Sequence, residues 1–268
     1  MSVLSTVAPW DLVAEGYSET TMNFFQGYID AALELVGLRS EDDIVDIACG
    51  PGTLALAAAD RVASVKAVDF SENMISMLRK GMIDRGMTNI EPYHGDGQNL
   101  PYDAASFDAA FSIFGLMFFP ERAKGYAEIF RTLKTGGRIC ISSWAPVECS
   151  PMMQTMFGAL GAIKPEMPSP KTDLESLENP DLLELELSAA GFRDVEVHRV
   201  TKSVEITSAE EFWESMVKGS APVTMMMNSM PAEAWRKKCE IAVESVKGTV
   251  GSFPASLSAD AWFGVGVK

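Results

Sequence analysis

The chain has 268 residues, of which 47% are hydrophobic and 22% are charged, enough to bury one large core or two small ones. Its net charge of −15 at pH 7 argues against a nucleic-acid partner, because nucleic-acid affinity comes mainly from Lys and Arg side chains that neutralise phosphates. No run of about 18 apolar residues predicts a membrane span, and residues 1–10 lack the pattern of a secretory signal.

The cysteine pattern favours neither a metal site nor a disulfide framework. No Cys-x-x-Cys spacing and no clustered histidine accompany the four cysteines, Cys49, Cys140, Cys149 and Cys239. We therefore expect a protein of the reducing cytoplasm without a bound metal. Cys49 is most simply a small buried side chain.

The first predicted element is a helix near the N-terminus. Apolar side chains recur at helical spacing from Phe24 to Val36, and Gly37 follows them. This pattern predicts a helix that ends at Gly37. We expect it to lie across the ligand site that the next segment forms.

The segment Ile44–Gly52 predicts a strand that runs into a glycine loop and then a helix, and Val65–Asp69 predicts the next strand. Gly50 and Gly52 allow a sharp turn and a close approach of backbone to a ligand, which a Cβ would obstruct. Asp69 ends the second strand, where a carboxylate can accept hydrogen bonds from ribose hydroxyls. The alternative is a tight turn in which Asp69 caps the helix that follows.

The glycine spacing alone does not identify the cofactor. Gly50, Gly52 and Ala55 also fit the loose dinucleotide pattern. However, Asp96 follows a third short apolar segment, and an acid there can accept a hydrogen bond from an adenine amino group. That placement suits a compact mononucleoside better than an extended dinucleotide.

The next elements continue the alternation of strands and helices. A helix begins at Ser71, a strand covers Ala109–Phe114, a helix covers Ala123–Leu133 and is stopped by Gly136, and a strand covers Arg138–Ser143. Alternating strands and helices predict a mostly parallel α/β sheet.

After Trp144 the pattern is interrupted by the prolines Pro146, Pro151, Pro165, Pro168, Pro170 and Pro180. Further on, the sequence predicts a helix from Asn179-Pro180 to Gly191, a strand over Val195–Ile206, a helix capped by Ser208 and Glu211, a helix opened by Pro231, and a final strand over Ala261–Val267.

Many methionines lie in this variable region: Met152, Met153, Met156, Met216, Met225, Met226, Met227 and Met230. Methionine adapts to irregular apolar shapes, so these side chains could line an apolar pocket, or they could fill a loosely packed edge. Helices inserted between the last two strands would stand above the ligand-binding edge of the sheet. We therefore expect residues 208–247, with the N-terminal helix, to cover the substrate.

From Ile44 to Trp144 the chain resembles the class I S-adenosylmethionine-dependent methyltransferases, within them the small-molecule group of the ubiquinone and menaquinone methyltransferases. The resemblance implies a doubly wound, mostly parallel seven-stranded sheet of Rossmann-like type, with an antiparallel edge strand and helical lid insertions. It also implies a single domain over residues 1–268, with a cofactor-binding core at 37–145 and variable parts at 1–36 and 146–260.

The resemblance assigns cofactor contacts residue by residue. The methionine part of S-adenosylmethionine would lie against Asp46, Ala48, Cys49, Gly50, Gly52 and the backbone of Ser112. Asp69 would hold the ribose, and the adenine would lie against Phe70, Met74, Asp96, Gly97 and Gln98. Tyr17 and Trp144 would stand near the methyl group. Ala48 departs from the family, which often has glycine there, and Lys134-Thr135 replaces the usual Lys-Pro; we expect cofactor binding to survive both.

These features predict an enzyme that transfers a methyl group from S-adenosylmethionine to a small apolar or aromatic acceptor by in-line displacement. An NAD-type oxidoreductase and a non-catalytic S-adenosylmethionine-binding protein are the alternatives. No catalytic residue is assigned, since His94 and His198 are better explained as structural residues. The acceptor atom and the oligomeric state do not follow from the sequence.

Overall fold

The computed structural model describes residues 3–167 and 173–268; Pro168 and Pro170 lie outside the described residues. The strands are β1 (Asp43–Ile47), β2 (Ser64–Asp69), β3 (Ile90–His94), β4 (Phe107–Ile113), β5 (Leu133–Trp144), β6 (Arg193–Ile206) and β7 (Ala255–Val267). The helices are α1 (Ala8–Val36), α2 (Thr53–Ala58), α3 (Glu72–Arg85), α4 (Arg122–Thr132), α5 (Pro151–Ile163), α6 (Pro180–Ala189), α7 (Ala209–Gly219), α8 (Ala221–Asn228) and α9 (Ala232–Val250).

The strands form one seven-stranded sheet in the order β3-β2-β1-β4-β5-β7-β6. The first five are parallel, whereas β7 runs antiparallel to both of its neighbours, β5 and β6. The predicted doubly wound sheet with an antiparallel strand near its edge is therefore confirmed. The strand order reverses between β1 and β4, and such a reversal opens a crevice at the carboxyl ends of the strands.

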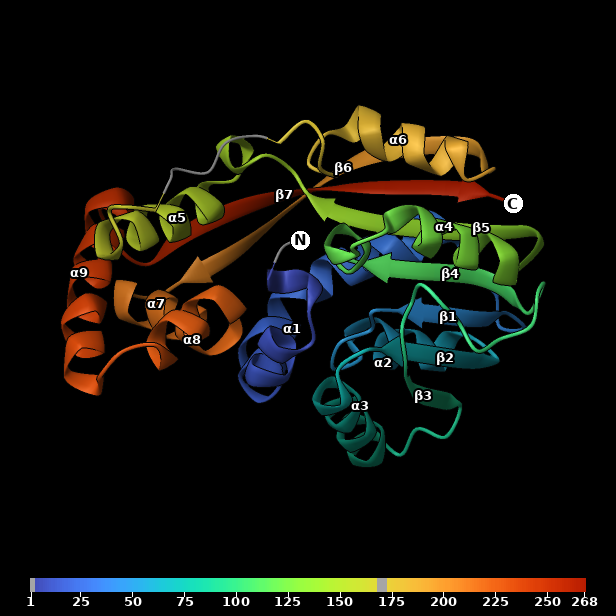
Figure 1. Ribbon diagram of the computed structural model, residues 1–268, viewed down its shortest axis with the longest axis horizontal. Coiled ribbons are helices and arrows are strands. Elements are labelled where there is room, and N and C mark those ends of the chain that lie inside the picture. The colour runs from blue at the N-terminus through green and yellow to red at the C-terminus, as the bar shows by residue number, and fades with distance from the viewer. Residues whose placement is uncertain (1–2, 168–172) are drawn as a thin grey trace.

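Alternating side chains of the strands bury two opposite faces of the sheet. In β1, Ile44 packs with α1, α2 and α3 on one face, and Val45 packs with α4 and α6 on the other. The same alternation separates Ala109 from Ala110 in β4. Side chains of successive strand residues point to opposite faces, so a continuous apolar strand needs helices on both sides. Figure 1 shows these two helical layers around the sheet.

The remaining helices form a separate lobe. Helices α5, α7 and α9 share a core with the distal parts of β6 and β7, in which Phe212, Trp213 and Val246 are buried. Figure 1 shows that these two long strands leave the sheet and pass into the lobe, while α1 stands between the lobe and the rest. The lobe is thus anchored by strands that are continuous with the central sheet.

Three helix caps are found where the sequence predicts them. Ser71 and Ser208 accept hydrogen bonds from the backbone N–H groups of Met74 and Glu211, and Asn179 accepts one from Asp181. Each satisfies an N–H that has no partner within its helix. The carboxylate of Glu211 does not close a capping box; it accepts a hydrogen bond from the Thr207 hydroxyl.

Several boundaries differ from the predictions. Helix α1 begins at Ala8, well before Phe24, because Pro9 at the first turn favours a helix start and the turns before Phe24 pack on the lobe and on α3. Strand β5 begins at Leu133, so the double glycine lies inside an irregular strand rather than in a loop. Strand β7 begins at Ala255 rather than Ala261, since it pairs with β6 as far as Ile206.

The region after Trp144 is more regular than the prolines suggest. Pro151 occupies the first turn of the 13-residue helix α5, where a missing N–H costs nothing, and Pro222 does the same in α8.

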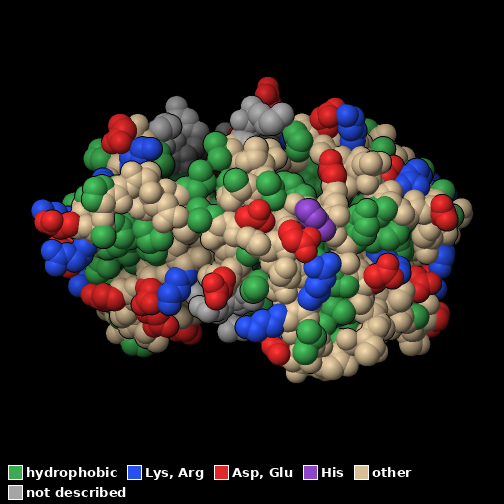
Figure 2. Space-filling view, turned by 60° about the horizontal axis from the view of Figure 1, so that its bottom comes forward, with side chains coloured by type: hydrophobic (Ala, Val, Ile, Leu, Met, Phe, Trp, Pro, Cys, Tyr) green, Lys and Arg blue, Asp and Glu red, His purple; other side chains and the backbone are tan. Residues whose placement is uncertain are grey.

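None of the described helices is long and apolar enough to cross a membrane. Figure 2 shows acidic and basic side chains interspersed among apolar ones over one face, with no continuous basic patch among its described residues.

Candidate active site

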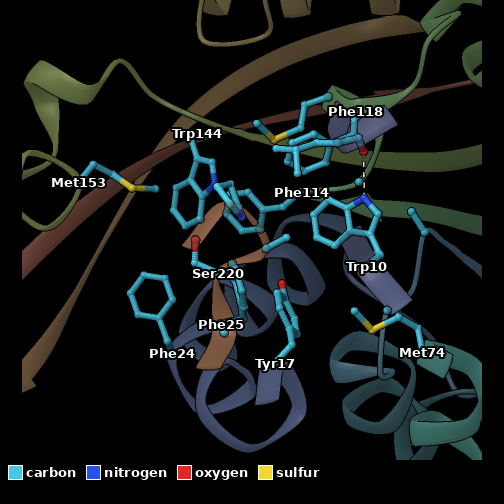
Figure 3. A pocket seen from close by; sticks show the side chains of 18 of the residues that line it. Trp10, Tyr17, Phe24, Phe25, Met74, Phe114, Phe118, Trp144, Met153 and Ser220 are labelled. Carbon is cyan, nitrogen blue, oxygen red and sulfur yellow. Dashed lines mark hydrogen bonds between the residues drawn. The ribbon is translucent and has the colours of Figure 1, made fainter. Parts of the chain in front are cut away.

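A cavity of about 940 Å³ opens at the carboxyl ends of the parallel strands, between the sheet and the helical lobe. The ends of β1, β2, β4 and β5 contribute Ala48, Phe70, Phe114 and Trp144 to its wall. Figure 3 shows the rings of Trp144, Phe114 and Phe25 on one side, Trp10 and Met74 on the other, and Tyr17 between them. Its volume is at the upper end for small-molecule sites, which leaves room for two ligands side by side.

The fold brings most of the predicted cofactor contacts to this cavity. The wall includes Tyr17, Ala48, Gly50, Asp69, Phe70, Met74, Asp96, Gly97 and Gln98. Asp46 and Cys49 line a small adjoining cavity of about 50 Å³, which shares Tyr17, Ala48, Gly50 and Phe114 with the large one. Gly52 and Ser112 line neither cavity.

The glycine loop has one position that is open and one that is packed. A Cβ on Gly50 would meet no atom within 4 Å, so the backbone there faces free space. A Cβ on Gly52 would lie 2.3 Å from the Leu78 side chain, so this glycine lets the loop pack closely against α3. Both adopt positive φ angles, of 55° and 88°. Gly50 is thus the position at which a ligand could approach the backbone.

Ala48 also has a left-handed backbone, with φ of 56°. This conformation costs a non-glycine residue roughly 1–2 kcal/mol. The chain therefore keeps at this position the backbone geometry that a glycine would adopt without strain. Such local strain is commonly retained at functional sites.

Asp69 is held at the end of β2 by backbone N–H groups. Its two carboxylate oxygens accept hydrogen bonds from Gly50 (2.8 Å) and Ser71 (2.9 Å), and the side chain is only 6% exposed. Burial raises its pKa to about 6, although these two hydrogen bonds favour the anion. The carboxylate thus ties the glycine loop to the start of α3. Its remaining lone pairs can accept from hydroxyls of a ligand in the cavity.

Asp46 is a buried carboxylate with an oxygen that lacks a partner. The side chain is 2% exposed, and Oδ2 forms no hydrogen bond with the described residues. Burial, with the nearby charge of Asp69, raises its pKa to about 7, while the Ala55 N–H opposes the shift. A buried acceptor without a donor destabilises the free protein. A ligand ammonium group in the adjoining small cavity could supply the missing donor.

The loop after β3 presents Asp96 to the cavity. Its carboxylate accepts a hydrogen bond from the backbone N–H of Gln98 at 2.8 Å, which fixes its direction. Gly97 lies beneath it, where a Cβ would collide with Phe119 and Ile47 at 2.6 and 2.7 Å. The small residue therefore lets this loop settle on the end of the sheet beside the cavity.

The start of α1 closes the cavity on the side of Asp69. Asp11 accepts a hydrogen bond from the Ser71 hydroxyl and, through its backbone carbonyl, one from Asn73. Trp10 packs on Phe118 with ring centroids 5.0 Å apart and donates to the Leu4 carbonyl at 2.9 Å (Figure 3). The beginning of the chain is thus bound to α3 and to the loop after β4.

Aromatic rings form the wall on the other side of the glycine loop. Phe114 and Trp144 stack with centroids 4.1 Å apart, and Phe25 lies 5.1 Å from Phe114. Phe114 has a φ of 56°, a strained conformation for a bulky residue, and its N–H donates to the Ser142 hydroxyl. The turn after β4 thus directs a large ring into the cavity.

Tyr17 and four methionines also line the cavity. Burial, with the nearby charge of Asp69, raises the pKa of Tyr17 well above its ordinary value, so its hydroxyl stays protonated. Four of the eight variable-region methionines line the cavity: Met152, Met153, Met156 and Met216. The expectation of a methionine-lined wall thus holds for these four, whereas Met225, Met226, Met227 and Met230 do not line it.

The two histidines lie away from the cavity, and Cys49 lines only the small adjoining cavity. His94 contacts the Phe70 carbonyl and Glu72, and His198 contacts Glu196; neither lines the cavity. Burial raises the pKa of the Cys49 thiol well above its usual value, which removes its nucleophilic form. Within residues 3–167 and 173–268, no group of three or more His, Cys, Asp or Glu is arranged to hold a metal ion.

Sequence reasoning missed several residues of the wall. Trp10 lies upstream of the predicted start of α1, and Phe118 lies in a short 3-10 turn after β4 (Leu116–Phe118). Phe114 could have been found, because it is the last residue of the predicted strand Ala109–Phe114, at the ligand-binding edge. Ser220 and Pro222 lie at the junction of α7 and α8, and α8 itself was not predicted.

Comparison with known proteins finds a family match over the segment that carries the glycine loop. Residues 44–137 match the family described as a methyltransferase domain. Demethylmenaquinone methyltransferase of Clavibacter sepedonicus is 36% identical over 142 residues, which cover 52% of this chain and 57% of that protein. The chain thus spans little more than half the length of this relative.

Two solved structures share the fold at low identity. The YcgJ protein of Bacillus subtilis superposes with a TM-score of 0.57 at 18% identity, over 90% of this chain and 97% of that one. Phosphoethanolamine N-methyltransferase 2 of Haemonchus contortus, solved with S-adenosylhomocysteine, gives 0.55 at 18% identity, over 90% and 52%. Residues 44–137 are thus similar to methyltransferase domains, and the chain shares its fold with these two structures.

Proposed function

We propose that the protein transfers the methyl group of S-adenosylmethionine to a small apolar acceptor that carries a ring. The observation that carries this proposal is the juxtaposition, in one cavity, of the polar glycine-loop side and a wall of aromatic and methionine side chains. The glycine-loop side can hold a nucleoside and an amino acid group. The aromatic and methionine wall suits an uncharged ring system.

The residues around the glycine loop fit S-adenosylmethionine. Gly50 leaves room for close approach, and Asp46 offers an unpaired buried oxygen to the cofactor ammonium. Asp69 and Asp96 would accept from the ribose hydroxyls and the adenine amino group, and Met74 would pack on the adenine ring. When bound, the cofactor supplies a methyl group already activated by its sulfonium.

The chain's own contribution is to orient the acceptor and to exclude water. Phe25, Phe114 and Trp144 would fix the acceptor ring, and the start of α1 covers the cavity from the side of Asp69. Alignment of the two reacting groups can supply about 7–11 kcal/mol of the barrier, more than a positioned base adds. The proposed reaction therefore does not require a dedicated catalytic residue.

Neither alternative function accounts for the whole site. An NAD-type oxidoreductase would use the Gly50 and Gly52 spacing but would have no use for Asp96. A non-catalytic binding protein would have no use for the apolar half of the cavity. The relatives named as demethylmenaquinone methyltransferases support an apolar, ring-bearing acceptor by analogy.

Calorimetric titration of the protein with S-adenosylmethionine, S-adenosylhomocysteine and NAD tests the proposed function. We expect micromolar binding of the first two, lost in Asp69→Ala, because that change removes the ribose acceptor and releases the Gly50 and Ser71 N–H groups. Glu240→Gln, an exposed change on α9, is the matched control and should bind as the wild type does. Binding of NAD alone would overturn the proposal.

A further inference from the structure

The charged side chains that line the large cavity all carry the same sign. They are Asp69, Asp96, Glu178, Glu205 and Glu211; no Lys, Arg or His side chain is among the described residues of the wall. A carboxylate or phosphate on an acceptor would therefore meet repulsion and no counter-charge. The cavity discriminates against anionic acceptors.

Three of these acids lie on the acceptor side. Glu178 borders the cavity together with Ala145 and Val147, which follow β5, and its carbonyl accepts a hydrogen bond from Trp262 on β7. Glu205 lies near the end of β6, and Glu211 lies in the first turn of α7. Asp69 and Asp96, by contrast, belong to the cofactor side.

None of the three acceptor-side acids forms an ion pair with a described residue. The ion pairs of the structure lie elsewhere, for example between Arg122 and Glu186 or between Arg138 and Asp42. Glu178 is half-buried, and among the described residues the donor to its carboxylate is the Asp173 N–H at 3.4 Å. Burial raises the pKa of Glu178, as expected for a carboxylate that lacks a counter-ion.

The apolar wall of the same compartment is rich in aromatic faces. Phe24 stacks on Trp144 with centroids 6.1 Å apart, and Phe25 lies 5.9 Å from Trp144. Aromatic faces attract cations, most strongly in the case of Trp. Carboxylates without a described ion-pair partner attract cations, and so do aromatic faces. Both line the same side of the cavity, so both favour a cationic ligand there.

We propose that the acceptor is a ring-bearing amine, cationic when it binds, and that the protein methylates its nitrogen. The ring would pack between Phe24, Phe25 and Trp144. The ammonium would be held by the acceptor-side carboxylates, mainly that of Glu178. This inference rests on the proposed methyltransferase function. It keeps the apolar ring of the proposed acceptor and adds a cationic amino group to it.

The methylation step balances in atoms and charge. The bound ammonium gives one proton to a carboxylate of the compartment, which passes it to water, and the nitrogen regains its lone pair. That pair forms the N–CH₃ bond while the S–CH₃ bond breaks and its electrons return to sulfur. The products are S-adenosylhomocysteine and an N-methylammonium ion, whose cation the aromatic wall and the carboxylates also accommodate.

Binding of matched compounds in the presence of saturating S-adenosylhomocysteine tests the acceptor class. The probes are an amine, the corresponding alcohol and the corresponding carboxylic acid, each built on a phenyl, an indole and a naphthyl ring. We expect the amine of at least one series to bind about tenfold more tightly than its alcohol, and the acid not to bind, since a charge-assisted hydrogen bond is worth that much. The proposal is wrong if no amine binds more tightly than its alcohol.

Two variants test the role of the carboxylate. Glu178→Gln should remove most of the amine's advantage over the alcohol, and Glu178→Arg should allow the acid to bind. Glu240→Gln serves again as the control, since this exposed acid does not line the cavity and should leave the ranking unchanged. An unchanged ranking in both Glu178 variants would contradict the assignment.

The same experiments distinguish a wrong acceptor class from a wrong methyltransferase function. Retained S-adenosylhomocysteine affinity in each variant shows that the fold and the cofactor side are intact. If that ligand binds and labelled methyl groups reach the alcohols as fast as the amines, the acceptor class is wrong and the methyltransferase function stands. If neither cofactor form binds, the proposed function itself fails.

Discussion

Replacing Asp46 by Asn should stabilise the free protein at neutral pH. Asp46 is buried, one of its oxygens has no partner, and its pKa is raised to about 7. A carboxylate whose pKa is raised in the folded state destabilises that state wherever it is ionised. Asn keeps the shape and the acceptor for the Ala55 N–H but carries no charge.

The magnitude follows from the pKa shift. A rise from 3.8 to about 7 corresponds to a loss of about 4 kcal/mol of folding free energy above pH 7. The amide adds a buried N–H that needs a partner, at a cost of about 1–3 kcal/mol. We therefore expect Asp46→Asn to be more stable than the wild type by about 1–3 kcal/mol at pH 8.

The contribution of Asp46 to stability depends on pH. Between pH 3.8 and about 7 the folded protein holds a proton on Asp46 that the unfolded chain has released, so this group makes stability fall as pH rises through that window. The advantage of Asp46→Asn should therefore grow from near zero at pH 5 to its full size at pH 8. Urea unfolding followed by circular dichroism measures it.

Asp42→Asn is the matched control for this experiment. Asp42 is equally buried at 2% exposure, but it accepts hydrogen bonds from Arg138 and from the backbone N–H of Arg39. Removing its charge leaves the Arg138 guanidinium without its carboxylate partner, so we expect a loss of about 3–5 kcal/mol. The reasoning would be refuted if Asp46→Asn were less stable than the wild type at pH 8, or if its effect did not change with pH.

Three further changes test the site. Ala48→Gly should raise the stability of the free protein by about 0.5–1 kcal/mol in urea unfolding, because glycine adopts the positive φ without strain; a loss of stability would contradict this. Gly50→Ala should cost about 1–2 kcal/mol for its φ, yet weaken S-adenosylmethionine binding in calorimetry by at least about tenfold, because its Cβ would occupy open ligand space; unchanged affinity would show that the cofactor lies elsewhere. Trp144→Ala should leave cofactor affinity unchanged and raise the acceptor KM about tenfold, since it removes a stacking face; an equal loss of cofactor affinity would place this ring on the wrong side of the site.

The residues that the sequence identified best are those whose role is local. Ser71, Asn179 and Ser208 cap helices through bonds to residues two or three positions away. Asp69 ends a strand that its apolar run already delimits, and the strand-loop-strand unit places it opposite Gly50. The residues that line the cavity on the side of the glycine loop were therefore predictable almost residue by residue.

Two predicted contacts lie outside the cavities for reasons that the sequence does not contain. Gly52 is required by its approach to Leu78 on α3, a helix that begins twenty residues later. Ser112 is fully buried inside β4, and its hydroxyl forms no hydrogen bond with the residues that the structure describes. Motif matching marks both positions, but only packing decides which of them face a ligand.

By itself the sequence determined the parallel α/β core, its cofactor loop and its helix ends, because strand and helix periodicities and capping act between residues close along the chain. The tertiary structure alone decided the aromatic half of the cavity. There Phe25, Trp144 and Glu178, which are far apart in the sequence, meet at one cavity. Their proximity depends on which apolar faces the sheet and the lobe bury against α1. The acidic side chains come to line one cavity only when these faces pack together.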